Sequence, residues 1–323
     1  MIIDSHRHLV GSGWTRGGYV MSLAKMFGNL WNRVHRANKT TDEFIQDVMQ
    51  TFVDPEGDKI VEEMDRAGVD KTVIFAVDWG LTTGEPSVGI REQNRAHAYA
   101  AMKHPGRFIP LAGIDPRRGD AMRMARECIE EWGMKGLKLM PSAGFHPDDP
   151  ICWPLYEYCS DRKLPIMFHA GGIEVGWQWA QPMYISSAAE KFHDVKMIMA
   201  HAGCESWQQA MWACRHIPNM YMDISIWQWE FAMFPEKFYR WLRDIVDEVT
   251  PWKVLFATDA PYPNTLVPLA DWVGAIKNPK TSAVTFTQEE KDILLGKAAE
   301  QVWDLSPMNG PVPEGPLKNE YGR

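Results

Sequence analysis

The sequence of 323 residues lacks the features of several specialised classes of protein. It has only five cysteines, and no two of them form a Cys-x-x-Cys pair, so neither a disulfide framework nor a cysteine zinc site is indicated. We expect free thiols in a reducing, cytoplasmic compartment. Lys and Arg number 34 against 42 Asp and Glu, a net charge of −8, which argues against the basic surface of a nucleic-acid-binding protein.

Long apolar runs are also absent. No uncharged apolar run approaches the roughly 18 residues that a membrane-spanning helix needs, so we expect no membrane segment. The first residues, 1–6, have neither the basic nor the apolar region of a secretory signal. Hydrophobic residues still make up 45% of the chain, including 15 tryptophans and 19 methionines. We expect most of these in a core, and some at an apolar pocket or a subunit contact.

Short apolar runs alternate with longer segments of helical period. Helices are predicted between the runs, for example over residues 116–132, 153–162, 205–214 and 235–249. The eight runs that predict strands are 1–4, 71–77, 107–114, 136–140, 164–168, 195–200, 220–225 and 253–258. This alternation predicts an α/β fold, a (β/α)₈ TIM barrel, whose usual size is about 250 residues. A doubly wound open sheet is the competing fold, but no glycine-rich phosphate fingerprint follows an early strand.

The chain is longer than a minimal barrel, and we expect the surplus in residues 10–53 and 78–105. These segments predict loop or helical insertions over one face, which distort the barrel. Asp54-Pro55-Glu56 predicts a helix start, with proline at the first helical position. Thr287-Gln288-Glu289-Glu290 predicts a capping box for a closing helix that ends near Trp303. Residues 1–303 are therefore predicted to form a single barrel domain.

Residues 304–323 differ in composition from the rest of the chain. They contain four prolines and three glycines, which predicts an extended C-terminal tail rather than a further helix.

Five ionisable residues stand at the ends of predicted strands. His6 and His8 flank one residue of the first strand, and side chains two positions apart on a strand point the same way. His169, His201 and Asp259 each end a later apolar run and precede a loop-forming segment. In a parallel barrel the carboxyl ends of the strands meet at one mouth, where barrel chemistry is found. The sequence therefore predicts a shared metal site at this mouth.

As an ordered set, the motifs of the chain resemble the amidohydrolase superfamily, specifically its amidohydrolase-related branch. That branch also contains the aminocarboxymuconate-semialdehyde and resorcylate-type decarboxylases. The resemblance covers nearly the whole chain and is carried by DSHRH at 4–8, GLKLMPS at 136–142, FHAGG at 168–172, AHAGCESW at 200–207, FATDAPYP at 256–263 and ILLGKAAEQVW at 293–303.

The resemblance implies a metal site. One divalent ion would be held by His6, His8, His169 and Asp259, with zinc favoured and manganese or cobalt as alternatives. His201 would stand beside the metal-bound water as an acid, a base or an orienting group. Lys138 lies on the fourth predicted strand, where some relatives carry a carboxylated lysine that bridges two metals. In this branch the lysine stays unmodified, so we expect a single metal, with Lys138 pairing a carboxylate or the substrate.

Substrate contacts are predicted from position along the chain. Trp177, Trp179 and Glu174 follow His169 closely and are candidates to cover the pocket. Arg16 and Arg33, in the first insertion, are candidates to pair with a substrate carboxylate, for which arginine is a natural partner.

The resemblance implies a metal-dependent enzyme, which we expect to be a homodimer. Its substrate would be a small organic acid, lactone or amide. We favour hydrolysis, in which activated water attacks a carbonyl while the catalytic residues Asp259 and His201 handle protons. The alternative is non-oxidative decarboxylation of an aromatic or muconate-type acid, in which His201 or Asp259 protonates carbon. Ala260 stands where such decarboxylases often have an aromatic residue, which favours hydrolysis.

A non-enzymatic metal-binding protein is a third hypothesis. The full set of ligands and the candidate proton-transfer residue argue against it, because a chain that had lost its activity would be expected to lack at least one of them.

Overall fold

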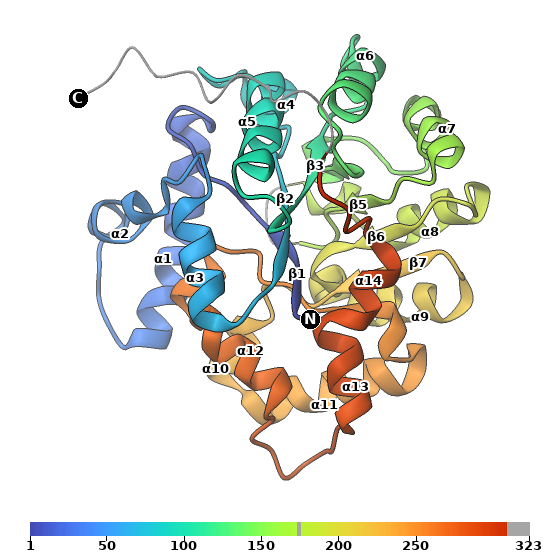
Figure 1. The fold of residues 1–323 in the computed structure, drawn as a ribbon. Helices are drawn as coiled ribbons and strands as arrows, with labels where there is room; N and C mark the ends of the chain where they lie inside the picture. Colours follow the sequence, from blue (N-terminus) through green and yellow to red (C-terminus); the bar gives the residue numbers. More distant parts are fainter. Residues whose placement is uncertain (173–175, 309–323) are drawn as a thin grey trace.

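The computed structural model describes residues 1–172 and 176–308. Eight parallel strands form one sheet in chain order, and the helices between them surround it (Figure 1). The strands are β1 (Ile3–Arg7), β2 (Lys71–Phe75), β3 (Phe108–Gly113), β4 (Leu137–Leu139), β5 (Ile166–Phe168), β6 (Met197–Met199), β7 (Met220–Asp223) and β8 (Val254–Leu255). Each overlaps one of the eight predicted runs, so the predicted (β/α)₈ barrel is confirmed.

The barrel is closed by backbone hydrogen bonds between β1 and the segment that follows β8. The Ser5 N–H donates to the Phe256 carbonyl at 2.8 Å, and the His8 N–H donates to the Ala260 carbonyl at 2.9 Å. In return, the Asp259 N–H donates to the His6 carbonyl at 2.8 Å. Residues 3–8 and 256–260 therefore lie side by side, which brings the carboxyl ends of β1 and β8 to the same part of the barrel mouth.

Apolar side chains fill the barrel interior according to the period-two alternation of the strands. Val73 and Phe75 of β2 lie in the interior cluster, whereas Ile74 packs against the surrounding helices. The end of the chain joins this cluster through Trp303, whose indole N–H donates to the Ser5 hydroxyl at 3.1 Å. The closing helical segments are α13 (Gln288–Asp292), η9 (Ile293–Lys297) and α14 (Ala298–Val302). They cover the amino-terminal end of the strands and leave the opposite end for a site.

The remaining helices occupy the outside of the barrel and its insertions (Figure 1). They are α1 (Gly17–His35), α2 (Thr41–Asp47), α3 (Asp58–Ala67), α4 (Gly80–Thr83), α5 (Ile90–Lys103), α6 (Ala121–Arg126), α7 (Trp153–Arg162), α8 (Pro182–Lys191), α9 (Trp207–His216), α10 (Gln228–Met233), α11 (Pro235–Val249) and α12 (Leu269–Lys277). The predicted helices over 153–162 and 235–249 have the observed bounds, and the predicted capping box at Thr287 and Glu290 is present.

Two predictions about helices were wrong in detail. The helix expected to open at Pro55 begins at Asp58, because Gly57 adopts a left-handed φ of 80°; Asp54 caps it from the preceding loop by accepting the Ile60 N–H at 3.0 Å. The segment 78–105 was expected to be an insertion. It contains α5, which packs on β2 and β3 as the regular helix of this barrel unit, so only the short stretch before it is additional.

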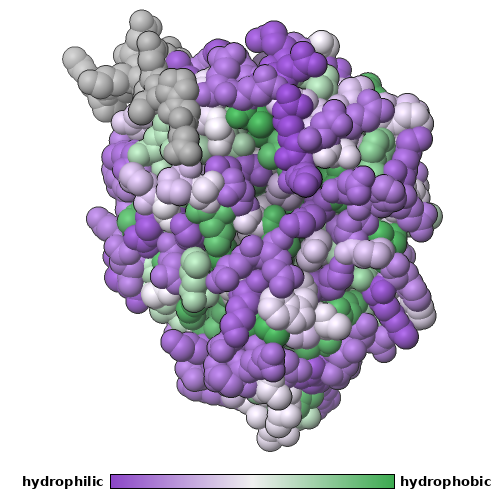
Figure 2. Space-filling view, turned by 45° about the vertical axis from the view of Figure 1, so that its right-hand side comes forward, coloured by the Kyte–Doolittle hydropathy of each residue, from purple (hydrophilic) through white to green (hydrophobic). Residues whose placement is uncertain are grey.

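The surface of the barrel carries both hydrophilic and hydrophobic residues. Figure 2 shows one face, on which hydrophilic residues dominate and hydrophobic residues form small separate patches. Among the described residues, no helix has both the length and the apolar composition that crossing a membrane requires. Residues 309–323, most of the predicted tail, lie outside the described residues, and the domain boundary at 303 stays a prediction.

Candidate metal centre

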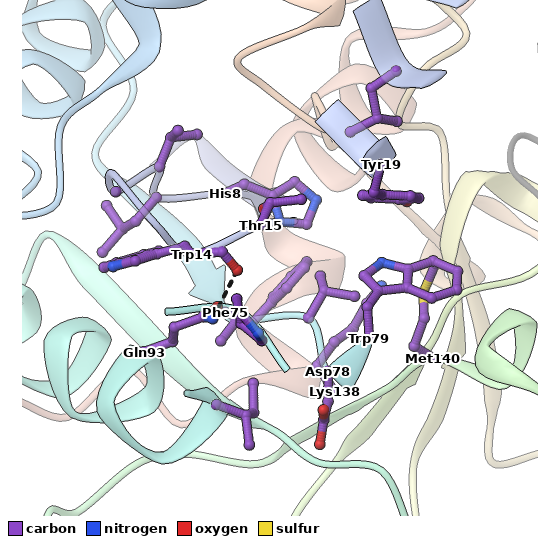
Figure 3. Close-up of a pocket in the computed structure, with 18 of the residues that line it drawn as sticks. His8, Trp14, Thr15, Tyr19, Phe75, Asp78, Trp79, Gln93, Lys138 and Met140 are labelled. Carbon is purple, nitrogen blue, oxygen red and sulfur yellow. Dashed lines mark hydrogen bonds between the residues drawn. The ribbon is translucent and has the colours of Figure 1, made fainter. Parts of the chain in front are cut away.

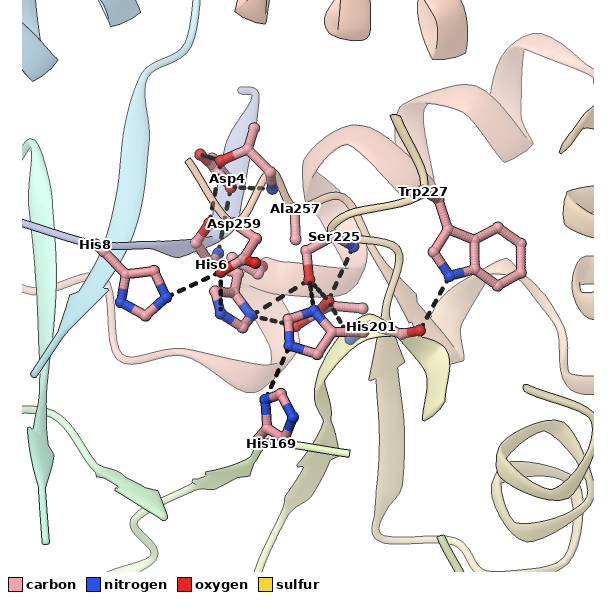
Figure 4. Close-up of polar contacts among 12 residues, drawn as sticks. Asp4, His6, His8, His169, His201, Ser225, Trp227, Ala257 and Asp259 are labelled. Atoms are coloured by element: carbon pink, nitrogen blue, oxygen red, sulfur yellow. Dashed lines mark hydrogen bonds and ion pairs between the residues drawn. The ribbon is translucent and has the colours of Figure 1, made fainter. Parts of the chain in front are cut away.

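The five strand-end residues lie at the same end of the barrel and line one pocket. His6 is the penultimate residue of β1 and His8 directly follows that strand, while His169, His201 and Asp259 follow β5, β6 and β8. Figure 4 shows their side chains pointing toward one another. The ring centre of His6 lies 5.4 Å from that of His8 and 4.8 Å from that of His201, and His169 lies 4.9 Å from His201.

Asp259 contacts two of these histidines. Its Oδ1 atom lies 3.1 Å from Nε2 of His6 and 2.9 Å from Nε2 of His8. One ligand atom from each of the three residues falls within 4.8 Å of the others, so the three could hold one cation. The predicted ligand His169 stands outside this group, because its Nδ1 atom faces Nε2 of His201 at 3.2 Å.

Asp223, at the end of β7, is a buried residue of the site that the sequence analysis missed. Its Oδ2 atom lies 3.0 Å from Nδ1 of His6. Its Oδ1 atom accepts the backbone N–H groups of His201 at 2.9 Å and Ser225 at 3.0 Å, and also the Ser225 hydroxyl. Burial raises the pKa of Asp223, but the charge and hydrogen bond of His6 outweigh this and hold the pKa at about 2. Asp223 is therefore an ionised carboxylate that only accepts hydrogen bonds.

A chain of hydrogen bonds that begins at Asp223 determines which ring nitrogen of His6, His201 and His169 carries the proton. Because the carboxylate accepts, Nδ1 of His6 carries a proton, and the Ser225 hydroxyl donates to Oδ1. The Ser225 oxygen can then accept Nδ1–H of His201 at 2.7 Å, which leaves Nε2 of His201 to accept Nδ1–H of His169. The remaining lone pair of His169 is on Nε2, a buried atom without a hydrogen-bond partner among the described residues.

These residues fit a bound cation. When His6 is neutral and donates its Nδ1 proton to Asp223, a lone pair on Nε2 faces the carboxylate oxygen of Asp259 at 3.1 Å. Two lone pairs at that distance repel each other unless a proton or a metal ion stands between them. His8 presents its Nε2 to the same oxygen, and His169 keeps an unpartnered Nε2 in the same pocket. Imidazole and carboxylate ligands of this kind suit a divalent transition metal.

Burial and a neighbouring cation keep most of the imidazoles neutral, which is the metal-binding form. Burial lowers the pKa of His8, lowers that of His169 well below its usual value and lowers that of His201 to about 3. Lys138 adds to each of these shifts. His6 differs. Burial and Lys138 also lower its pKa, but the charges of Asp223 and Asp259 outweigh them and raise it.

The backbone of two site residues is held in a left-handed conformation. His201 has φ 60° and Asp259 has φ 59°, which side chains larger than glycine rarely adopt. His201 is fixed on both sides, because its N–H donates to Asp223 and its carbonyl accepts the Trp227 indole N–H at 3.0 Å. Strained backbone of this kind concentrates at functional sites, where the surrounding structure holds it in place.

Aromatic side chains line the pocket around His8 (Figure 3). Its volume is about 150 Å³, a size at which an apolar protein cavity accepts one benzene ring. Lys138 is buried, and its Nζ atom lies 4.6 Å from the ring centre of Phe75. The walls are formed by Trp14, Tyr19, Phe75, Trp79 and Met140. The pocket therefore combines aromatic walls with a cation beside the candidate metal ligands.

Of the predicted substrate residues, some line the pocket and others do not. Arg16 lines the mouth of the pocket, where its Nη1 donates to the Glu85 carbonyl at 3.3 Å. Arg33 does not line the pocket, and its guanidinium lies 4.7 Å from the ring centre of Trp229. Trp177 is 53% exposed and also lies outside the pocket. Glu174 lies outside the described residues.

Comparisons with known proteins agree with this fold. The model of the family described as amidohydrolase matches residues 3–305. An uncharacterised TIM-barrel protein from Bordetella bronchiseptica superimposes with a TM-score of 0.68 at 18% identity, covering 93% of this chain and 97% of that one. No curated protein matches the sequence significantly.

Two further solved structures are similar. The 5-carboxyvanillate decarboxylase from Sphingomonas paucimobilis has a TM-score of 0.63 at 17% identity, covering 94% of this chain and 98% of that one. A dihydroxybenzoic acid decarboxylase from Polaromonas, with bound manganese and 2-nitroresorcinol, has a TM-score of 0.64 at 17% identity, covering 93% and 96%. These likenesses concern the fold, while the family model matches nearly the whole sequence. The chain therefore belongs to the amidohydrolase family.

Proposed function

We propose that the chain is a metal-dependent carboxy-lyase that removes carbon dioxide from a small aromatic acid without a change in oxidation state. The observation that carries the proposal is Lys138, a buried cation at the base of an aromatic-walled pocket beside the candidate metal ligands. Such a pocket suits a ring of about benzene size that bears a carboxylate. The two decarboxylases of similar fold support the same reaction and reverse the preference for hydrolysis that Ala260 gave.

His6, His8, His169 and Asp259 are the residues that would hold the metal. When bound, a divalent ion supplies a fixed positive charge that orients the substrate's oxygen atoms and stabilises negative charge as it develops. Manganese or zinc fits the proposal, and the manganese of the Polaromonas decarboxylase supports the former.

Lys138 binds and orients the substrate carboxylate. The aromatic walls exclude water from that carboxylate, which strengthens its pairing with the ammonium group and holds it in one orientation. Among the walls, Phe75 lies against Lys138 and both β1 histidines: its ring centre is 4.8 Å from that of His6 and 4.9 Å from that of His8. The ring of the substrate would therefore lie over the ligand cluster.

Proton transfer is assigned to Asp259. The bond between the ring carbon and the carboxyl carbon breaks, its electron pair stays on the ring carbon, and one proton must replace the departing carbon dioxide. The Oδ1 atom of Asp259 contacts His6 and His8, which leaves Oδ2 as the oxygen that would transfer a proton from solvent to the ring carbon. His201 holds His169 in position through the hydrogen bond between their ring nitrogens.

The test is a substrate panel assayed with protein loaded with manganese or zinc. Hydroxybenzoic acids are supplied with a ¹³C-labelled carboxyl group, and release of labelled carbon dioxide is measured beside hydrolysis of small lactones and anilides. The proposal predicts carbon dioxide release from at least one acid, lost in Asp259→Asn. Turnover of lactones or amides with no carbon dioxide release from any acid would contradict it and restore the hydrolase hypothesis.

A further inference from the structure

A second cavity, of about 360 Å³, lies outside the metal pocket and shares no lining residue with it. Four of its nine lining residues are tryptophans. The lining comes from α1, α11 and the segments that follow β6 and β7: Leu30, Cys204, Glu205, Trp207, Ile226, Trp227, Trp229, Glu230 and Trp241. We refer to these residues as the tryptophan groove.

Three of the indoles form a corner. The ring centres of Trp207 and Trp241 lie 5.5 Å apart, and those of Trp227 and Trp241 lie 5.8 Å apart with the planes at 71°. Trp207 and Trp227 lie 6.4 Å apart with their planes at 82°. Trp227 stands steeply to the other two rings, whereas the planes of Trp207 and Trp241 meet at 32°. The three rings pack directly against one another, so they offer a ligand the ring surfaces that line the cavity, to which an organic cation is attracted.

The charges that line the groove are of one sign. Glu205 and Glu230 are its only charged residues, and no lysine or arginine among the described residues lines it. Glu205 is held in place, because its Oε2 accepts the Gly172 N–H at 2.9 Å. Burial raises the pKa of Glu230, and the charge of Lys237 offsets this only in part, so the carboxylate lacks some of the solvation that a bound cation would replace.

Two of the four tryptophans already contact cations of the chain itself. The guanidinium of Arg33 lies 4.7 Å from the ring centre of Trp229, and Nζ of Lys237 lies 4.2 Å from that of Trp241. Neither cation lines the groove. Among the described residues, none is placed over Trp207 or Trp227 in the same way. Among the described residues, Trp207 and Trp227 are therefore the indoles of the groove that carry no cation of the chain.

We propose that the tryptophan groove binds a small organic cation of the quaternary ammonium class. The indole faces attract the diffuse charge, Glu205 and Glu230 balance it, and the cavity has room for the alkyl groups. This site is separate from the metal pocket, so it does not depend on the proposed reaction.

The experiment compares two probes of nearly the same shape by calorimetry at constant ionic strength. Choline carries the positive charge, and 3,3-dimethylbutan-1-ol replaces its nitrogen with carbon and is neutral. We expect saturable choline binding and at least about tenfold weaker binding of the neutral alcohol. Equal affinity for the two would show an apolar groove without cation selectivity, and absence of choline binding would show that there is no site; either result overturns the proposal.

Three variants locate the binding. Glu230→Gln and Trp207→Leu should each weaken choline binding about fivefold or more, while Trp212→Leu should leave it unchanged. Trp212 is the matched control, since it lies on α9 like Trp207 but is 55% exposed and lies outside the groove. If Trp207→Leu does not fold, the choline affinity of Glu230→Gln tests whether the groove is the binding site. Wild-type choline affinity in folded Glu230→Gln would place any binding elsewhere and contradict the assignment.

Discussion

The Nδ1 atom of His6 and the Oδ2 atom of Asp223 lie 3.0 Å apart, with both side chains buried. The pair fixes the proton of His6 on Nδ1 and turns Nε2 toward Asp259. A carboxylate behind a ligating histidine orients the ring and raises its basicity, and loss of such a partner typically reduces metal affinity about 10- to 100-fold. The properties of the proposed metal site therefore depend on a residue that is not itself a ligand in our proposal.

Replacing Asp223 with asparagine tests this dependence. The amide keeps the size of the side chain, but its NH₂ group can donate to Nδ1 of His6 and move the ring proton to Nε2. We expect about 10- to 100-fold weaker manganese or zinc binding in a folded protein, measured by titration against a chromophoric chelator. Asp244→Asn, an exposed residue of α11, is the control and should bind as wild type does. Unchanged affinity in Asp223→Asn would remove Asp223 from the site.

The sequence predicted the strand-end residues because their positions follow from alternation alone. His169, His201 and Asp259 each end an apolar run, and parallel strands bring such ends to one mouth. Asp223 escaped prediction because it lies inside the predicted strand 220–225, whereas the other site residues stand at the ends of their predicted strands. The signal was present, since Asp223 is the one charged residue in an otherwise apolar and hydroxylated run.

The pocket walls could not be predicted from pattern. Trp14 and Tyr19 come from the first insertion and reach the pocket by the path of a long loop and α1, and no local periodicity determines that path. For the same reason Arg16 and Arg33 cannot be told apart from their positions in the sequence, although of the two only Arg16 lines the pocket. Closeness to His169 along the chain likewise does not place Trp177 in the pocket, since Trp177 is exposed and does not line it.

Lys138 is expected to contribute to substrate binding rather than to metal binding. Lys138→Met keeps the length of the side chain and removes its charge. We expect KM for a carboxylate substrate to rise about 10- to 100-fold, since hydrogen bonds to charged groups contribute about 1.5 to 3 kcal/mol, while metal content stays unchanged. Lys135→Met, which removes the cation of an exposed ion pair with Asp304 near the same strand, should leave KM unchanged. An unchanged KM in Lys138→Met would contradict the assigned role.

Arg7, between the two β1 histidines, is buried and paired with Glu63 of α3. Its Nε and Nη1 atoms have no hydrogen-bond partner among the described residues, so Glu63 is its main source of compensation. We expect Glu63→Ala to lower the free energy of unfolding by about 3 kcal/mol, because it leaves a buried charge unpaired. Glu62→Ala removes an exposed partner of Arg66 and should change the free energy of unfolding by less than about 0.5 kcal/mol. Urea denaturation measures the free energy of unfolding of both variants, and an equal decrease in the two would contradict the assigned role of Glu63.

His97 predicts a pH dependence of stability. It is fully buried, and burial lowers its pKa to about 4, against about 6.5 in an unfolded chain. Between these values the unfolded chain binds the extra proton, so stability is highest above about pH 6.5 and falls as the pH falls toward 4. The loss by about pH 5 is about 2 kcal/mol.

Urea denaturation at about pH 7.5 and about pH 5 measures this loss. The decrease in the free energy of unfolding should be about 2 kcal/mol greater in the wild type than in His97→Gln. His193→Gln, which changes a histidine that is 77% exposed, should behave like the wild type. The same decrease in all three proteins would show that His97 titrates normally in the fold.

The most direct test of the central claim is the metal content of the folded protein. Wild type and Asp259→Ala are incubated with excess manganese or zinc, freed of unbound ions by gel filtration and measured by elemental analysis, with circular dichroism to confirm folding. The account predicts about one equivalent per chain in the wild type and a large loss in Asp259→Ala. About two equivalents would contradict a single-metal site with an unmodified Lys138. A folded wild-type protein that retains no metal would contradict the account as a whole.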